Sequence, residues 1–539
     1  MSTLTFAALI SSALSVAVAG DGQLRSTKII YHGWDLIDAA PSVVLANAEK
    51  FEKVGIDGVT LRLSASLPDG RKFSFDSLMN DPAWNAAAFT DQLPVLRKIA
   101  EHRHLRESLL CAWLAPKKRL DWRDDAAWNT FATSMGVLSE IARETGLKGI
   151  LIDEEDYPKT KQYGLMPDDP SYDVAAKLAR KRGQEVFSKV FAAYPNITLL
   201  AFRLLAREAI YSRSSDPVGL AASKRDLWPW FVNGMVDVMP LTVTLIEGNE
   251  HAYKYDAGAC DFFRSACEQH SSAINLIMPE NRFKYRGVLR AGFGLYLDSY
   301  ICSEKSEYYK GPMCGSRLRH FAENLGQAAE AADGYVWIYG ERKAIIPWNE
   351  TAANAQFAPN GTWRGVPTWN DALPGFNDEL LLVKDVRAYI GSAVSRMKEA
   401  GTLTNLATAT ARPWPIWHDG QSEDSSFGSD GDSVFIKGPA RGCHHVHIDG
   451  VKPGERYAVL VKCRGQQAVA TVFWKKDDVW RWELPGFPLT FVDGKECRDG
   501  GAVATVPQGV NRLVINLGAS VWPGETVVFD QVEVYRIEI

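Results

Sequence analysis

The feature of this sequence that most constrains its fold is an alternation of apolar, strand-like runs with longer amphipathic segments. Such alternation is typical of α/β proteins, in which helices cover a parallel sheet. We assign eight runs to strands, over residues 28–34, 57–63, 108–114, 148–153, 197–203, 236–243, 289–298 and 334–340. Eight units match the count of a closed sheet, and no glycine-rich phosphate loop follows a strand. The sequence therefore predicts a (β/α)8 TIM barrel over residues 28–400, completed by a helix at 377–401.

A different texture begins near residue 405, where short alternating runs are separated by Gly, Pro and Asp. No helical period is found beyond this point, so the sequence predicts an antiparallel β-sandwich over residues 408–539. The stretch at 408–420, which contains Pro and Trp, is interpreted as the linker. Two domains also suit a chain of 539 residues, which is too long for one ordinary core.

The first 19 residues have features of a secretory signal peptide. An apolar stretch ends in Ala-Val-Ala before Gly20, which fits a small-x-small cleavage site, although no Lys or Arg precedes it. We expect a secreted or periplasmic protein, the alternatives being a membrane-tethered or fortuitously apolar start. No later segment reaches the roughly 20 uncharged apolar residues of a spanning helix, so we expect no stable membrane insertion after cleavage.

Charge and cysteine content narrow the functional classes. The net charge of −5 comes with no long basic run, which argues against nucleic acid as a partner. Eight Cys are too few for a disulfide scaffold in a chain of this length. Cys302 with Cys314 and Cys260 with Cys267 are the closest candidate pairs, and free buried thiols are an equal alternative.

In a TIM barrel, the working residues stand at the carboxyl ends of the strands. Acids and aromatic residues dominate those ends here. In chain order the candidates are Trp34, Asp35, Arg62, Trp113, Asp153–Tyr157, Arg203, Tyr296, Asp298, Trp337, Tyr339 and Glu341. His32 stands alone on the first strand and is interpreted as a structural residue. Because the histidine clusters of zinc hydrolases are missing, we expect no metal and no cofactor.

The most distinctive of these ends is GILIDEEDYP at residues 149–158, where an apolar strand runs into four consecutive acids. Crowded carboxylates raise one another's pKa, and cleavage of a glycosidic bond requires a protonated carboxyl. The alternative to a catalytic role is that this acidic run caps the next helix or faces water. A regular strand places Asp153 and Glu155 together, with Glu155 as the acid, whereas a bent strand pairs Asp153 with Glu154.

GILIDEEDYP also resembles the fourth-strand motif of glycoside hydrolase family 18 chitinases. Asp153 and Glu155 match the last two acids of that motif, but the earlier acid falls on Leu151, and Asp156 is an additional residue before Tyr157. The resemblance implies that an N-acetyl group of the sugar serves as nucleophile. GYVWIYGE at 334–341 resembles the terminal barrel strand of many glycoside hydrolases, which implies that Trp337 floors a sugar subsite.

Glu341 is the preferred second carboxyl, because strand alternation places it on one side with Trp337 and Tyr339. An ion pair with Arg342 or Lys343 is the alternative, and Asp298 could serve instead. The residues expected to bind substrate are Trp34, Asp35, Arg62, Trp113, Tyr157, Tyr296, Asp298, Trp337 and Tyr339. Glu247 and Glu250, assigned to the region after the sixth strand, either line the cleft or are solvated loop acids, and the second interpretation is preferred.

The closing strand of the sandwich, TVVFDQVEVYRI, resembles galactose-binding-like modules that accompany secreted carbohydrate-active enzymes. The resemblance implies glycan binding through exposed aromatics, with Trp474, Trp480 and Trp482 as candidates. A purely structural sandwich is the alternative. His444, His445 and His447 alternate along one strand, so we predict no metal site there.

The sequence thus predicts an exported glycoside hydrolase that acts on a carbohydrate with carboxylates and without a cofactor. One alternative is a carbohydrate-binding barrel that has lost catalysis, which Leu151 in place of an acid permits. A second alternative is a polysaccharide lyase, in which Arg62 and Arg203 grip the carboxylate of a uronic acid.

Overall fold

The computed structural model describes residues 27–537 except 38, 158, 207–218, 220–221, 224, 314, 349–357, 359–360, 411, 422–424, 485 and 494–496. The expected signal peptide and Cys314 lie outside the described residues. Cys260, Cys267 and Cys302 are free thiols, so the candidate pair between Cys260 and Cys267 is not formed. Within the part of the chain described, no helix is both long and apolar enough to cross a membrane.

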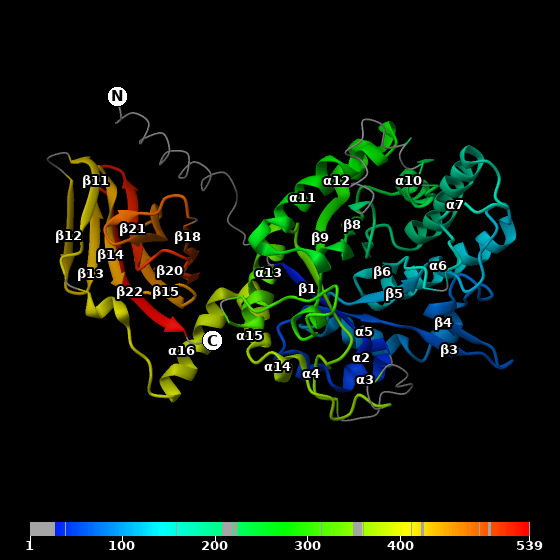
Figure 1. Ribbon diagram of the computed structural model, residues 1–539, viewed down its shortest axis with the longest axis horizontal. Helices are drawn as coiled ribbons and strands as arrows, with labels where there is room; N and C mark the ends of the chain where they lie inside the picture. The colour runs from blue at the N-terminus through cyan, green and yellow to red at the C-terminus, as the bar shows by residue number, and fades with distance from the viewer. Residues whose placement is uncertain are drawn as a thin grey trace.

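Eight parallel strands form a closed barrel, which confirms the predicted α/β fold class (Figure 1). In spatial order they are β1 (Lys28–Gly33), β10 (Tyr335–Gly340), β9 (Leu289–Tyr296), β8 (Thr244–Glu247), β7 (Thr198–Ala201), β6 (Gly149–Asp153), β5 (Leu109–Trp113) and β2 (Gly58–Leu61). The parallel pairing of β1 with β10 closes the ring. Strand residues are buried on both faces, because helices pack outside and side chains fill the inside.

The sixth strand lies later in the chain than the sequence predicted. The run at 236–243 is wrong as a strand: its first residues end helix α10 (Trp228–Val238), and β8 begins only at Thr244. The stretch is apolar almost throughout, and such a run cannot be assigned to helix or strand by periodicity alone. Pro229 near the start of α10 favours the helix.

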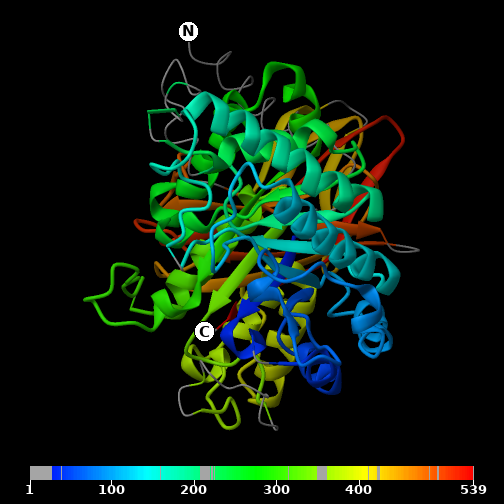
Figure 2. The same ribbon diagram turned by 90° about the vertical axis from the view of Figure 1, so that its right-hand side faces the viewer.

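Helices surround the barrel (Figure 2). Besides α10 they are α2 (Trp34–Ile37), α3 (Pro41–Ala46), α4 (Ala48–Phe51), α5 (Leu93–Glu101), α6 (Asp125–Thr145), α7 (Tyr172–Ala193), α11 (Asp261–Ser271), α12 (Arg282–Val288), α13 (Arg317–Ala331), α14 (Trp369–Ala372), α15 (Phe376–Lys384) and α16 (Val386–Glu399). The single helix expected at 377–401 is broken at Asp385, which separates α15 from α16. A small hairpin, β3 (Ser64–Ser66) and β4 (Lys72–Ser74), follows β2.

The C-terminal region is a sandwich of two antiparallel sheets, as predicted. One sheet contains β11 (Ile416–Gln421), β14 (Ala440–Asp449), β21 (Arg512–Val521), β16 (Ala468–Lys476), β17 (Val479–Trp480) and β18 (Phe487–Pro488). The other contains β12 (Ser426–Asp430), β13 (Ser433–Lys437), β22 (Thr526–Ile537), β15 (Arg456–Arg464), β20 (Arg498–Thr505) and β19 (Thr490–Asp493). The interpretation of 408–420 as a linker is wrong, because Trp414 is buried in the sandwich core and β11 begins at Ile416.

The barrel and the sandwich pack against each other through α15 and α16. Tyr389 and Ile390 of α16 form an apolar cluster with Ala458, Tyr535 and Ile537 of the sandwich. Beside this cluster, Arg456 Nη1 of β15 donates to Glu379 Oε1 of α15 at 2.6 Å, and each side chain is only 4% exposed. Burial raises the pKa of Glu379 although Arg456 opposes the shift, so the carboxylate depends on its partner.

We expect Arg456→Ala to lower the free energy of unfolding by about 3 kcal/mol, because it leaves the Glu379 carboxylate buried and unpaired. Arg464→Ala is the matched control on the same strand: Arg464 pairs with Asp530, is 56% exposed, and should change stability by less than about 1 kcal/mol. Urea unfolding followed by tryptophan fluorescence measures both. Equal effects of the two substitutions would contradict a buried, mutually dependent pair.

Candidate active site

The acids that follow β6 gather at the carboxyl end of the barrel. Asp153 and Glu154 are buried, with exposed fractions of 9% and 8%, while Glu155 is half-buried. Asp153 Oδ1 accepts a hydrogen bond from the backbone N–H of Glu155 at 3.0 Å, which turns the chain where the strand ends. Burial, followed by the charges of Glu155 and Glu154, holds the pKa of Asp153 well above its usual range.

Glu154 forms an ion pair with Arg203, which follows β7. Arg203 Nε donates to Glu154 Oε1 at 2.7 Å and lies 3.6 Å from Glu250 Oε2. Burial raises the pKa of Glu154 to about 7, although the charge of Arg203 opposes the shift. Within the described residues Glu154 Oε2 has no hydrogen-bond partner, so this buried carboxyl has one uncommitted acceptor oxygen.

Glu155 is the most accessible of the three acids. Tyr157 Oη donates to Glu155 Oε2 at 2.6 Å, and the Tyr157 side chain is 66% exposed. Trp113, on the adjacent strand β5, donates from its indole N–H to the Glu155 backbone oxygen at 2.9 Å. Trp113 therefore anchors the backbone of this loop, and the Glu155 carboxyl lies beside the exposed ring of Tyr157.

A fourth carboxyl completes the cluster. Glu250 follows β8, its side chain is 18% exposed, and it lies within hydrogen-bonding contact of Glu155. Its interpretation as a solvated loop acid is wrong. The alternative that Glu250 lines the cleft agrees with its position, because β8 ends at Glu247 and brings Glu250 next to a strand end. We call Asp153, Glu154, Glu155 and Glu250 the mouth carboxyls.

Glu247, the last residue of β8, is also not solvated. Its side chain accepts hydrogen bonds from the backbone N–H groups of Leu204, Leu205, Ala206 and Asn249 at 2.6–3.1 Å. It is 1% exposed. Glu247 is thus a structural clamp that ties the loop after β7 to β8 and holds Arg203 near the mouth carboxyls.

Aromatic rings line the interior beside the mouth carboxyls. Tyr253, Tyr296 and Tyr339 lie with centroids 5.3–6.1 Å apart and planes 7–30° apart, and Tyr308 meets Tyr296 edge to face at 5.3 Å. Trp337 lies deeper: it is 1% exposed, stacks on Phe202 at 4.3 Å, and donates from its indole N–H to the Gly248 backbone oxygen. Tyr296, Tyr308 and Tyr339 are partly exposed and offer the accessible rings, whereas Trp337 and Tyr253 are buried.

Glu341 belongs to this tyrosine group. It accepts hydrogen bonds from Tyr339 Oη at 3.0 Å and from Tyr296, while Arg342 lies 3.4 Å from Asp298. Asp298 is buried and accepts from the Glu341 backbone N–H at 2.7 Å, and burial raises its pKa to about 6. Asp298 therefore positions the chain segment that carries Glu341.

Two expected substrate residues at the end of β1 lie on the outer side of the barrel. Asp35 is fully buried and accepts hydrogen bonds from Tyr31 Oη, the Ile345 backbone N–H and the Trp348 indole at 2.8–3.0 Å. Trp34 packs against the core between barrel and helices. Both belong to α2, which begins directly after β1 and carries the chain outward.

Arg62 is partly buried and lies near the mouth carboxyls. Its guanidinium lies 4.2 Å from the ring centroid of Phe75, and its charge opposes the raised pKa of Asp153. His32 hydrogen bonds with Thr60 Oγ1 at 2.7 Å, and burial, then the charge of Arg62, hold its pKa well below its usual range. His32 is therefore a neutral structural residue.

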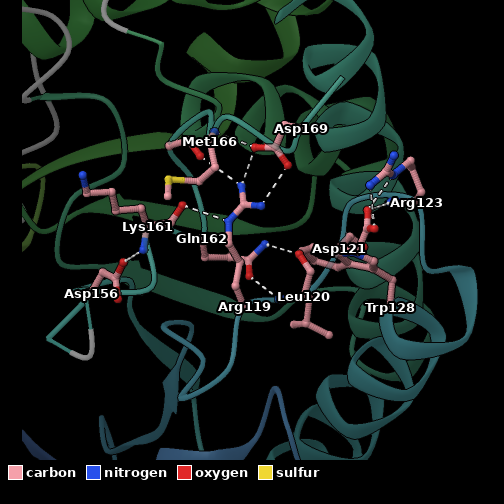
Figure 3. Close-up of polar contacts among 11 residues, drawn as sticks. Arg119, Leu120, Asp121, Arg123, Trp128, Asp156, Lys161, Gln162, Met166 and Asp169 are labelled. Carbon is pink, nitrogen blue, oxygen red and sulfur yellow. Dashed lines mark hydrogen bonds and ion pairs between the residues drawn. The ribbon is translucent and has the colours of Figure 1, made fainter. Parts of the chain in front are cut away.

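The loop between β6 and α7 is fastened to the loop after β5 (Figure 3). Arg119 donates to both carboxylate oxygens of Asp169 at 2.8 Å, and Gln162 exchanges hydrogen bonds with the backbone of Leu120 at 2.8 and 3.2 Å. Asp156 accepts from the backbone N–H groups of Thr160 and Lys161. Asp156, the fourth acid of the run, thus stabilises its own loop, while Asp153, Glu154 and Glu155 line the mouth.

Comparisons with known proteins give the following. No protein-family model and no curated protein matches the sequence. A chitinase catalytic domain from Pyrococcus furiosus has 12% identity and a TM-score of 0.34, over 67% of this chain and 96% of that one. A CBM4 structure has 20% identity and a TM-score of 0.17, over 23% of this chain and 86% of its own.

The tailspike protein 4 domain of bacteriophage CBA120 has 17% identity and a TM-score of 0.20 over 23% of this chain, which covers 20% of that protein. All three TM-scores are below 0.5, and no property of these proteins is transferred to this chain. Within the described residues, no group of three or more His, Cys, Asp or Glu side chains is arranged to hold a metal ion.

The raised pKa of Glu154 predicts a pH-dependent loss of stability. Its folded-state pKa of about 7 lies above the ordinary value of 4.5, so its contribution to stability is complete below pH 4.5 and is lost as the pH rises towards 7. Relative to Glu154→Gln, the wild type should therefore lose on the order of 3 kcal/mol across that interval. Urea unfolding at several pH values gives the difference. Parallel stability curves would contradict this assignment.

Proposed function

We propose that this protein is a glycoside hydrolase that cleaves glycosidic bonds by carboxylate general acid catalysis at the mouth of its barrel. One observation carries the proposal: carboxyls from separate strands converge there, several with pKa values raised by burial, beside accessible tyrosine rings. Such a site can hold a proton for a leaving oxygen and stabilise a positively charged sugar centre. Tyrosine rings offer flat faces to the apolar sides of a sugar.

Glu155 is the acid in this proposal. It is the most accessible of the mouth carboxyls after β6, whereas Glu154 is paired with Arg203 and Asp153 is buried against the turn. The likeness of GILIDEEDYP to the family 18 motif favours the same choice, with Asp153 next to the acid. Glu341, oriented by Tyr339 and Tyr296, is the candidate to hold a sugar hydroxyl or to stabilise the reacting carbon.

The lyase alternative is weaker. It requires Arg62 and Arg203 to grip a carboxylate of the substrate, but Arg203 is paired with Glu154 and lies near Glu250. Adding a further anion to a mouth already rich in carboxyls would be repulsive. A neutral sugar suits these charges better.

Substitution of Glu155 tests the hydrolase. We expect Glu155→Gln to lower kcat by about 10²–10⁴-fold on a glycan that the wild type cleaves, because the amide cannot donate the proton. Glu307→Gln is the control, since Glu307 is exposed and pairs with Lys254. A reducing-sugar screen over a broad glycan panel finds the substrate. Wild-type protein that binds glycans without any turnover would favour the inactive binding barrel.

The sandwich is proposed to bind the same carbohydrate. Trp480 and Trp482 stack at 4.6 Å with planes 17° apart, Trp482 is 50% exposed, and Lys475 lies 4.4 Å from the Trp480 ring centroid. Trp474 is buried in the core and is not available. Export also belongs to this proposal and is supported by the N-terminal sequence alone.

We expect Trp482→Ala to weaken binding of the full chain to a polymeric glycan at least about fivefold, because an aromatic ring contact contributes about 1 kcal/mol to the binding free energy. Hydrolysis of small soluble glycosides should be unchanged, since the barrel is untouched. Trp522→Ala is the matched control, because Trp522 is 69% exposed and lies outside the stacked pair. Affinity electrophoresis in glycan-containing gels measures the binding. Equal losses in both variants would contradict a specific role for the pair.

A further inference from the structure

Glu250 and Glu155 come from different strands and meet across β7. Glu250 opens the short helical turn Glu250–Lys254 after β8, where its backbone N–H donates to the Phe202 oxygen at 2.9 Å. Glu155 is held by Asp153 Oδ1 through its own backbone N–H at 3.0 Å. The backbone is thus anchored at both residues, and the two side chains lie within hydrogen-bonding reach of each other.

The surroundings of Glu250 favour a shared proton. The charged and titratable groups that face it are Glu154, Glu155, Arg203, Tyr157, Tyr253 and Tyr308. Arg203 is the cation among them, and it lies 2.7 Å from Glu154 Oε1 but 3.6 Å from Glu250 Oε2. Burial, then the charge of Glu155, raises the pKa of Glu250 to about 9. Two carboxyls in contact can form a hydrogen bond only when one of them carries a proton.

A second observation concerns Glu154, on the other side of Arg203. Its Oε2 atom is buried and, in the part of the chain that the structure describes, has no hydrogen-bond partner. A buried acceptor of this kind gains by accepting a hydrogen bond from a donor such as a sugar hydroxyl. The site therefore combines a proton-holding pair with an acceptor suited to a hydroxyl-bearing ligand.

We propose that Glu250 is a positioning residue that shares one proton with Glu155 and keeps Glu155 supplied as the acid of the site. This inference rests on the proposed hydrolase. The proton passes from Glu250 to Glu155 and then to the glycosidic oxygen, while the bond from that oxygen to the anomeric carbon breaks and its electron pair stays on the oxygen. Water adds to the carbon, and the proton that this water releases returns to the carboxyl pair.

Carbon-13 NMR of the full chain labelled at the glutamate carboxyl carbons tests the pair without requiring activity. The wild type should show a carboxyl that titrates above pH 7 and is absent from Glu250→Gln, and Glu155→Gln should move it to lower pH by removing the neighbouring charge. Glu307→Gln, at an exposed site, should leave it in place. If all wild-type glutamates have titrated below about pH 6, the proposal is overturned.

Kinetics on a cleaved glycan provide the second readout. Glu250→Gln should lower kcat about 100-fold with little change in KM, and the alkaline fall in activity should begin at lower pH, because Glu155 has lost its proton source. An unchanged pH profile overturns the proposal even if kcat falls. Circular dichroism checks folding, and Glu250→Asp, which retains a carboxyl, should recover part of the rate. If the pair titrates as expected but the protein cleaves no glycan, the proposed hydrolase is rejected and the shared proton is still supported.

Discussion

Closure of the barrel is the constraint on which the rest of this structure depends. β1 and β10 come from opposite ends of the barrel sequence, and their parallel pairing turns an open sheet into a ring. The carboxyl ends of strands remote in sequence then face one rim. Glu154, Glu250 and Glu341, which follow β6, β8 and β10, reach that rim for this reason. The mouth carboxyls are consequently a property of the closed sheet.

The site is built against the preference of carboxylates for water. Burial and mutual repulsion raise the pKa of Asp153, Glu154 and Glu250, and Arg203 compensates only part of the charge. A cluster of buried carboxyls is unfavourable by itself and persists only when the surrounding residues hold it in place. Here the Glu247 clamp and the fastening of Arg119 to Asp169 do so from either side. The mouth carboxyls and the acids that support them thus have different partners.

Two aspartates show how far sequence reasoning reaches. Asp35 and Asp153 both stand at strand ends, and the sequence predicts a role at the mouth for each. Asp153 remains there, whereas Asp35 is turned outward because a helix begins directly after β1. Glu250 is the opposite case, since the sequence favours a solvated loop acid and the structure places it beside Arg203 and Glu155 at the mouth. The exact bounds of one helix or strand therefore decide which acids reach the mouth of the barrel.

The sequence by itself determined the barrel, the sandwich and the acidic end of the fourth strand, because hydrophobic periodicity and turn residues are local signals that survive in a single chain. Only the tertiary structure decided which acids meet, which one Arg203 neutralises and which serve as clamps. Electrostatic interactions between buried groups depend on distance and on exclusion of water. Both are set between strands that are far apart in the sequence, so no local pattern encodes them.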